Sequence, residues 1–219
     1  MERNLGSGLA ARIVIFGLLV LFIYWAMPGS GVSEMKKMSA AMQNATSWRV
    51  QTVVAEPTKN VESLMEVYCP SRVHMVDKSV LDEGGRHFEN SSESIWIDGT
   101  NYAKKGLRWV VSQEQRYSTA TCKYGPRGTD TLLQTLDPIL VAGKIRKGDN
   151  RYVNGDRCRD WIASVPAPSG YRDEFIVCVG KGELPLEVST PDRRLVETYS
   201  DWNLPIKIEA PPAEELNPR

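Results

Sequence analysis

The stretch from Tyr152 to Pro211 constrains the fold more than any other part of the sequence. It consists of short runs that are rich in β-branched or aromatic residues, and each run is bounded by Gly, Pro, Asn or Asp. This pattern is typical of strands separated by turns. The stretch therefore predicts an antiparallel β-meander, with strands over residues 152–162, 175–179, 184–189, 196–203 and 206–208.

The cysteines predict disulfides instead of a metal site. The sequence holds four cysteines and only two histidines, and no pair of cysteines has Cys-x-x-Cys spacing. We therefore expect no metal and no cofactor. Cys158 and Cys178 lie on successive predicted strands, which predicts a disulfide between them. Cys69 and Cys122 remain, and by elimination they form the second predicted disulfide.

An apolar run from Ile13 to Met27 predicts an export signal at the N-terminus. At about 1.5 Å per residue the run spans about 22 Å, so it needs the apolar residues before Arg12 to cross a core of about 30 Å. Its aromatic end resembles an interface belt, which favours an uncleaved anchor, and a cleaved signal peptide is the alternative. Because Arg3 and Arg12 precede the run, both interpretations place the rest of the chain outside the cytoplasm. Residues 1–31 are thus a signal anchor or signal peptide with a short hinge.

Two further segments have helical spacing. After an N-cap at Ser33, the side chains of Met35, Met38 and Met42 share one face of a predicted helix. This stripe either packs in the core against a sheet or forms an adaptable wall for an apolar ligand.

The second helical segment begins near residue 129. Its apolar stripe consists of Leu132, Leu136, Ile139 and Leu140. The dipeptide Asp137-Pro138 interrupts it, which predicts two short helices or one kinked helix. The basic residues that follow, with Gly148 after them, are typical of a helix C-terminus: Lys144, Arg146 and Lys147.

Between the two helical segments, alternating apolar residues predict about four to six strands with hairpin spacing. Trp48 and Val50 share one face of the first of these strands, and Asp98-Gly99 predicts a tight turn between two others. The polar segment from Asp82 to Ser94 predicts a loop.

The order helix, strands, helix, strands resembles the lipoprotein-carrier superfamily typified by LolA, which includes the LppX and LprG lipid-binding proteins. Four sequence stretches carry the resemblance, together with the helix around Leu132: Trp48-Arg-Val-Gln-Thr, Ile97-Asp-Gly-Thr-Asn-Tyr, Tyr152-Val-Asn-Gly-Asp-Arg-Cys and Tyr199-Ser-Asp-Trp-Asn-Leu-Pro-Ile-Lys-Ile. The similarity covers roughly residues 33 to 211. It implies an α+β, mainly β fold, in which a curved, unclosed antiparallel half-barrel over residues 32–211 is covered by helices. Residues 212–219 are expected to form a flexible tail.

The resemblance also implies a function, because members of this superfamily hold acyl chains between sheet and helices. A single curved sheet must bury one face, and only the two helical stripes are available to cover it. We therefore expect an apolar ligand cavity lined by the following residues: Met35, Met38, Met42, Trp48, Val50, Leu132, Leu136, Ile139 and Leu140. The superfamily is bacterial, so the expected location is the inner membrane, single-pass, with a periplasmic C-terminal domain, or the periplasm after cleavage.

The expected function is non-catalytic binding of lipid, acyl chains or a lipidated protein. The sequence has no Gly-x-Ser-x-Gly elbow, phosphate loop or His-Glu-x-x-His, which argues against an enzyme. Its formal net charge is zero and it has no basic run, which argues against a nucleic-acid partner. Two alternatives stay open on the same fold: an envelope sensor or protein-interaction domain, and a purely structural envelope protein.

Overall fold

A computed structural model describes residues 31–83, 86–112, 144–166 and 172–217. These residues form one helix, eleven strands and two short 3-10 helices. The helix is α2 (Gly31–Gln43), and the first six strands are β1 (Ser47–Glu56), β2 (Lys59–Tyr68), β3 (Arg72–Glu83), β4 (Arg86–Ile97), β5 (Thr100–Lys105) and β6 (Arg108–Ser112). The others are β7 (Ile145–Val153), β8 (Asp156–Pro166), β9 (Arg172–Val179), β10 (Pro185–Ser189) and β11 (Leu195–Ser200), with η1 (Lys181–Glu183) and η2 (Ala213–Glu215).

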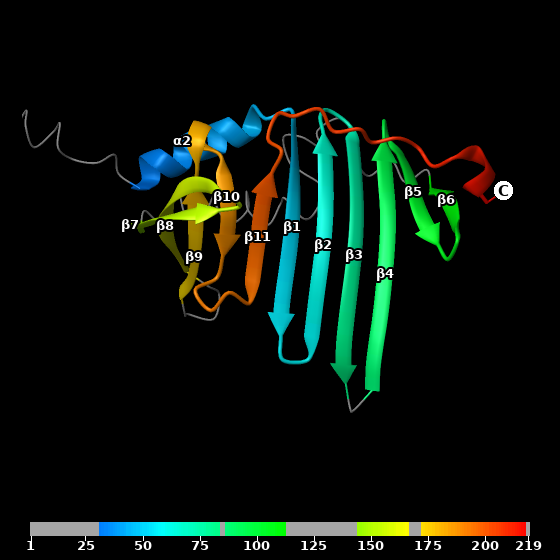
Figure 1. Ribbon diagram of the computed structural model, residues 1–219, viewed down its shortest axis with the longest axis horizontal. Helices are drawn as coiled ribbons and strands as arrows, with labels where there is room; N and C mark the ends of the chain where they lie inside the picture. Colours follow the sequence, from blue (N-terminus) through cyan, green and yellow to red (C-terminus); the bar gives the residue numbers. More distant parts are fainter. Residues whose placement is uncertain (1–30, 84–85, 113–143, 167–171, 218–219) are drawn as a thin grey trace, which may run out of the picture.

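All eleven strands lie in one antiparallel sheet of order β6-β5-β4-β3-β2-β1-β11-β10-β9-β8-β7 (Figure 1). It consists of two meanders, β1–β6 and β7–β11, that are joined where β1 pairs with β11, for example at Val50 and Tyr199. In the described part of the chain, β6 and β7 are the free edges of the sheet. The predicted fold class is confirmed: the protein is mainly β, with an unclosed antiparallel sheet.

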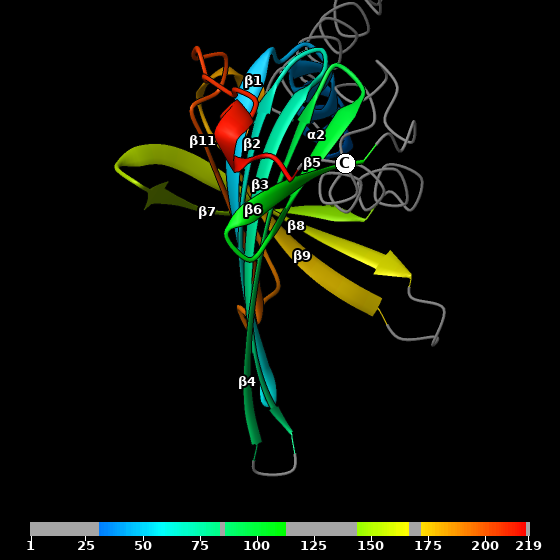
Figure 2. The ribbon, with the colours of Figure 1, turned by 90° about the vertical axis from the view of Figure 1, so that its right-hand side faces the viewer.

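Figure 2 shows β8 and β9 crossing the direction of β1–β4 at a steep angle, so the sheet is strongly twisted. We call the side that contacts α2 the helix face and the opposite side the outer face. Because successive side chains of a strand alternate, register assigns each residue to a face. Trp48 and Val50 belong to the helix face, together with their partners Val67 and Met65 on β2.

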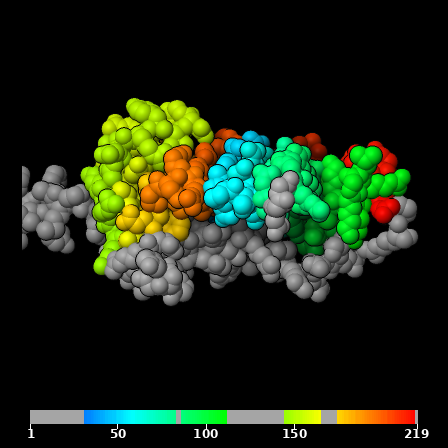
Figure 3. All heavy atoms as spheres, turned by 90° about the horizontal axis from the view of Figure 1, so that it is seen from below, coloured from blue at the N-terminus to red at the C-terminus, as the bar shows by residue number. Residues whose placement is uncertain are grey.

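The chain after β11 crosses the outer face and packs on β4–β6. Ile206 and Ile208 are buried there against Ile95 and Trp109. The red segment lies beside the green strands at one end of the molecule (Figure 3). Residues 212–217 belong to this packing, although the sequence analysis predicts a loose tail from 212. The Trp109 indole N–H donates to a Glu215 carboxylate oxygen over 3.1 Å, and Trp109 forms a parallel bridge with Leu216.

Several sequence-based expectations about the elements are wrong: Ser33 lies inside α2 and is not its N-cap, and residues 206–208 do not form a strand. Three further expectations are wrong. The predicted loop from Asp82 to Ser94 is instead the end of β3 and most of β4. The two strands pair along their whole length, from Arg72 opposite Ile97 to Glu83 opposite Arg86. These strand ends project from the body of the sheet and are largely exposed (Figure 2), so they need no apolar alternation.

The other two corrections fall near β7. The basic residues Arg146 and Lys147 lie in strand β7 and do not close a helix. The predicted strand over 152–162 is a hairpin, because Asn154 and Gly155 both have positive φ, 51° and 90°, and turn the chain between β7 and β8. This is the backbone of a type I′ turn, which Asn-Gly favours. The predicted turn at Asp98-Gly99 has the same conformation, with φ values of 50° and 86°.

The predicted disulfide between Cys158 and Cys178 is present, with a Cα–Cα distance of 5.4 Å, and joins β8 to β9 on the outer face. Cys69 is also disulfide-bonded. Its predicted partner Cys122 lies outside the described residues. The predicted signal anchor lies outside them as well, and no helix within the described part of the chain is long and apolar enough to cross a membrane.

Candidate ligand-binding site

The methionine stripe of α2 contacts the helix face of the sheet. Met35 and Met38 are completely buried and Met42 is 6% exposed. They belong to one apolar cluster with Trp48 and Val50 of β1, which also includes the following residues: Ala45, Met65, Val67, Val73, Trp161, Ala163, Val177, Val179, Val188 and Tyr199. The structure therefore brings five of the predicted cavity residues together. The other four lie outside the described residues: Leu132, Leu136, Ile139 and Leu140.

An aromatic stack joins Trp202 to this cluster. The ring of Trp202 lies 5.7 Å from that of Trp48 and 5.8 Å from that of Tyr199, with both pairs stacked. Trp202 is fixed by a 3.0 Å hydrogen bond from its indole N–H to the Pro185 carbonyl. The indole N–H of Trp48 is buried and has no hydrogen-bond partner among the residues that the structure describes. A buried donor without a partner is costly, so this group can bind an acceptor on a ligand.

A buried carboxyl group lies on the same face. Register places Glu197 opposite Thr52 of β1, so Glu197 points toward the helix face, and it is only 5% exposed. Burial raises the pKa of its carboxyl group above the ordinary value, although the Tyr199 hydroxyl donates a 2.7 Å hydrogen bond to it. Burial, and then the neighbouring Glu197 charge, raise the pKa of Tyr199. None of the ion pairs within the described ranges involves Glu197, so it is a polar group in an apolar wall.

A pocket of about 530 Å³ opens beside α2, at the β7 end of the sheet. Its walls come from α2, β7, β8, β9 and the η1 turn, and its lining residues are Glu34, Lys147, Arg159, Trp161, Val179, Gly180, Lys181, Gly182 and Glu183. Sequence reasoning missed this pocket. One sequence signal indicates the strand that carries Lys147: Ile145 and Lys147 alternate with Arg146, so they share one strand face. The helical spacing of the apolar residues just before them favours a helix instead and hides this signal.

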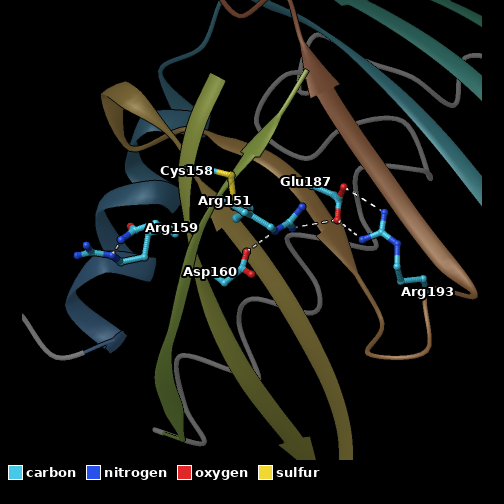
Figure 4. A network of polar contacts seen from close by, with 8 residues as sticks. Arg151, Cys158, Arg159, Asp160, Glu187 and Arg193 are labelled. Carbon is cyan, nitrogen blue, oxygen red and sulfur yellow. Dashed lines mark hydrogen bonds and ion pairs between the residues drawn. A yellow bond between two sulfur atoms is a disulfide. The ribbon is translucent and has the colours of Figure 1, made fainter. Parts of the chain in front are cut away.

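The outer face of the same strands carries a closed charge network (Figure 4). Arg151 donates to Asp160 over 2.8 Å and to Glu187 over 2.9 Å, and Arg193 donates to Glu187 over 2.9 Å. Burial alone would raise the pKa of Glu187, but hydrogen bonds from Arg193 and Arg151 lower it below the ordinary value. Every charge here has a partner, so the network stabilises the sheet and leaves no group for a ligand.

Within the stretches that the structure describes, no three His, Cys, Asp or Glu side chains lie close enough together to hold a metal ion. His74 lies half-buried on the outer face, between carboxylate oxygens of Glu66 at 3.0 Å and Glu93 at 3.1 Å. It is thus remote from the apolar cluster.

Comparison with known proteins supports the architecture. LprF from Mycobacterium bovis is 13% identical, with a TM-score of 0.55 over 84% of this chain and 98% of that chain. The Mycobacterium tuberculosis lipoprotein LppX is 14% identical, with a TM-score of 0.51 over 82% of this chain and 98% of that chain. The chain therefore has the fold of LprF and LppX, which agrees with the fold that the resemblance to the LppX and LprG proteins implies. No protein-family model and no curated protein matches the sequence. The fold is therefore established by structure, and function has to be argued from the site.

Proposed function

We propose that this chain is a non-catalytic binding module for lipid, acyl chains or a lipidated protein, which is tethered to the bacterial inner membrane by residues 13–27 and faces the periplasm. The observation that carries the proposal is the contact between α2 and the sheet, which is made by three buried methionines. Methionine side chains are unbranched and polarisable, and they adapt to a flexible apolar guest at little cost.

The helix itself is suited to movement. It has 13 residues, and an isolated helix of that length is marginal in water, so its position depends on the packing of its methionine face. If an acyl chain takes the place of some contacts between the methionines and the sheet, the methionines contact the acyl chain instead, and their apolar surface stays out of water. The unpartnered indole N–H of Trp48 adds a polar anchor on the same wall.

A second candidate function is protein interaction through the projecting ends of β3 and β4. There Phe88 is 49% exposed and its neighbours are mainly charged or polar. This candidate would use the far ends of the strands and leave the helix face unchanged. Substitutions on the helix face should therefore impair lipid binding but not this interaction.

The test uses the full chain in its own membrane and a photoreactive fatty acid, with crosslinked peptides identified by mass spectrometry. We expect crosslinks to α2 and to the helix face of β1 and β2. Met38→Trp should abolish them by filling the space under the helix, whereas Met38→Leu should retain them. Ala40→Trp is the matched control because residue 40 is exposed on the same helix.

Overpacking at Met38 costs about 1–3 kcal/mol, so each variant is first checked for its thermal unfolding transition. The proposal fails if the wild-type chain gives no crosslink above that of an unrelated membrane protein. It also fails if Met38→Trp and Ala40→Trp reduce crosslinking equally.

A further inference from the structure

We infer that the pocket beside α2 binds the anionic group, a phosphate or carboxylate, of an amphiphile whose acyl chain lies under the methionine stripe. This inference rests on the proposed function and adds the chemical class of the headgroup. Three cationic side chains converge on the pocket: Lys147, Arg159 and Lys181.

Register explains why two of these cations share the pocket. Lys147 of β7 pairs with Trp161 of β8, and Arg159 of β8 pairs with Val179 of β9. Paired residues point to the same side of an antiparallel sheet, so both cations lie on the helix face. Figure 4 shows Arg159 turned toward α2, whereas Arg151 and Asp160 lie on the other side of the strands.

The third cation comes from a tight turn between β9 and β10. Gly182 and Glu183 both have positive φ, 75° and 63°, and they bend the chain so that Lys181 reaches the same pocket. A left-handed conformation at two successive positions favours glycine at one of them. The turn thus adds a third cation to the two that β7 and β8 supply.

The charges of this pocket are not balanced from within the described part of the chain. No ion pair there involves Lys147 or Lys181, in contrast to the outer face, where Arg151 and Arg193 both contact carboxylates. Arg159 donates its Nε–H to Asn150 over 3.0 Å, which leaves its two terminal nitrogens for a ligand. An arginine fork flanked by lysines suits a planar carboxylate or a phosphate.

The two carboxylates of the lining, Glu34 and Glu183, do not cancel these cations. Glu34 accepts a 2.8 Å salt bridge from Lys37, which lies outside the pocket lining. Lys37 also feels the charge of Glu183, and both carboxylates raise its pKa, Glu34 more strongly. Together with Lys37, the three cations of the lining therefore outnumber the carboxylates Glu34 and Glu183, and the pocket keeps a net positive charge.

The base of the pocket joins the apolar site. Trp161 is 7% exposed and Val179 is 8% exposed, and both belong to the cluster that contains Met35 and Met38. A single ligand can therefore place its charge among the cations and its chain along the methionines. The pocket thus has charged side chains beside apolar ones. An anionic amphiphile can contact both, whereas a free anion contacts only the charged ones.

The experiment compares three probes on the purified full chain held in amphipol, by titration calorimetry below the micelle concentration. The probes are lysophosphatidic acid, a monoacylglycerol with the same acyl chain, and inorganic phosphate. The test variant carries Lys147→Gln, Arg159→Gln and Lys181→Gln. The matched control has the same loss of charge at three exposed positions away from the pocket: Lys59→Gln, Lys78→Gln and Arg108→Gln.

We expect wild type and control to bind lysophosphatidic acid about tenfold more tightly than the test variant does, since three partly exposed charge contacts are lost. Monoacylglycerol should bind all three proteins alike, which also shows that the test variant is folded. The preference should shrink at high salt.

The remaining outcomes separate this inference from the proposed function. Equal binding of lysophosphatidic acid by the test variant and the control, with monoacylglycerol bound by both, overturns the headgroup site and leaves the acyl site standing. Binding of phosphate but of neither amphiphile, lost in the test variant, would mean that the pocket takes a free anion only, and it overturns both the amphiphile inference and the acyl site. No binding of any probe to wild type overturns both.

Discussion

Two buried glutamates on adjacent strands provide a direct test of the charge arrangement. Glu187 of β10 and Glu197 of β11 are each only 5% exposed, but they point to opposite faces of the sheet. Glu187 is surrounded by arginines, whereas Glu197 is contacted by a tyrosine hydroxyl. Replacing each with glutamine keeps the shape and removes the charge. At pH 7 we expect Glu187→Gln to destabilise the fold and Glu197→Gln to stabilise it.

The magnitude for Glu187 follows from its three hydrogen bonds, which come from Arg151 over 2.9 Å and from Arg193 over 2.9 and 3.4 Å. Hydrogen bonds to charged groups contribute about 1.5–3 kcal/mol each. The loss is smaller than their sum, because Arg193 is 57% exposed to water and Arg151 keeps Asp160. We expect the free energy of unfolding to fall by about 2 kcal/mol, which lowers the Tm by about 4–8 °C in a domain of this size.

The magnitude for Glu197 has the opposite sign. Burial of its charge is unfavourable, and the single hydrogen bond from Tyr199 offsets only part of that cost. A glutamine Oε1 accepts the same bond without a buried charge. We expect Glu197→Gln to raise the free energy of unfolding by about 1 kcal/mol and the Tm by about 2–4 °C.

The pH dependence distinguishes the two groups further. The pKa of Glu197 is raised above 4.5, so between 4.5 and the raised value the folded state binds more protons than the unfolded state. The destabilisation by Glu197 is therefore complete above the raised pKa and is relieved as the pH falls to 4.5. The pKa of Glu187 is lowered below 4.5, so its stabilisation is complete above 4.5 and is lost as the pH falls through the lowered pKa.

The measurement is thermal unfolding of the full chain and the two variants, followed by tryptophan fluorescence, from pH 7 down to pH 4. The advantage of Glu197→Gln over wild type should shrink across this range, whereas the defect of Glu187→Gln should persist to below pH 5. If the two variants lower the Tm equally at pH 7, the assignment of opposite electrostatic roles is refuted.

Three further predictions concern other parts of the molecule. Cys158→Ala with Cys178→Ala should lower the free energy of unfolding by about 3 kcal/mol, and non-reducing peptide mapping of wild type should recover this pair and no crossed pairing. Ile208→Ala should cost about 2–4 kcal/mol in urea unfolding, because this side chain of the C-terminal segment is 3% exposed and packs against Ile95 and Trp109, whereas exposed Lys207→Ala should change stability by less than about 0.5 kcal/mol. A reporter that is active only outside the cytoplasm should function when fused after Arg219, and cytoplasmic activity instead would contradict the predicted topology.

The strands and the helix stripe were predictable because half-buried elements show their periodicity in sequence. Trp48 and Val50 alternate on β1, and the methionines of α2 recur at helical spacing, so both sets were assigned to the correct face. The bridge between Cys158 and Cys178 followed from neighbouring strands for the same reason.

The remaining features depend on contacts that no local pattern encodes. The ends of β3 and β4 are exposed on both faces, so polar residues such as Ser91 and Asn90 form strands through pairing alone. Lys147 follows a helical apolar pattern, which predicts a helix end, but it lies in β7 at the edge of the sheet. Its approach to Lys181 depends on the order of β7, β8 and β9, which only the tertiary structure specifies.

Charged groups are paired on the outer face of the sheet but largely unpaired on the helix face of the described chain. This difference helps to choose between the proposed functions. On the outer face of β7–β11, Arg151 and Arg193 are neutralised by Glu187 and Asp160, and the chain after β11 covers the apolar side chains of β4–β6. Such a surface has few unsatisfied groups to offer a partner. Among the residues that the structure describes, the helix face combines an indole N–H without a hydrogen-bond partner, a carboxyl group without a cation, and a cationic pocket lined in part by apolar side chains. Groups of this kind cost stability, and a fold that stabilises its outer face so fully gains nothing structural from them. The amphiphile that we propose would give each of these groups a partner, so binding at the helix face would explain more of the described chain than a purely structural role does.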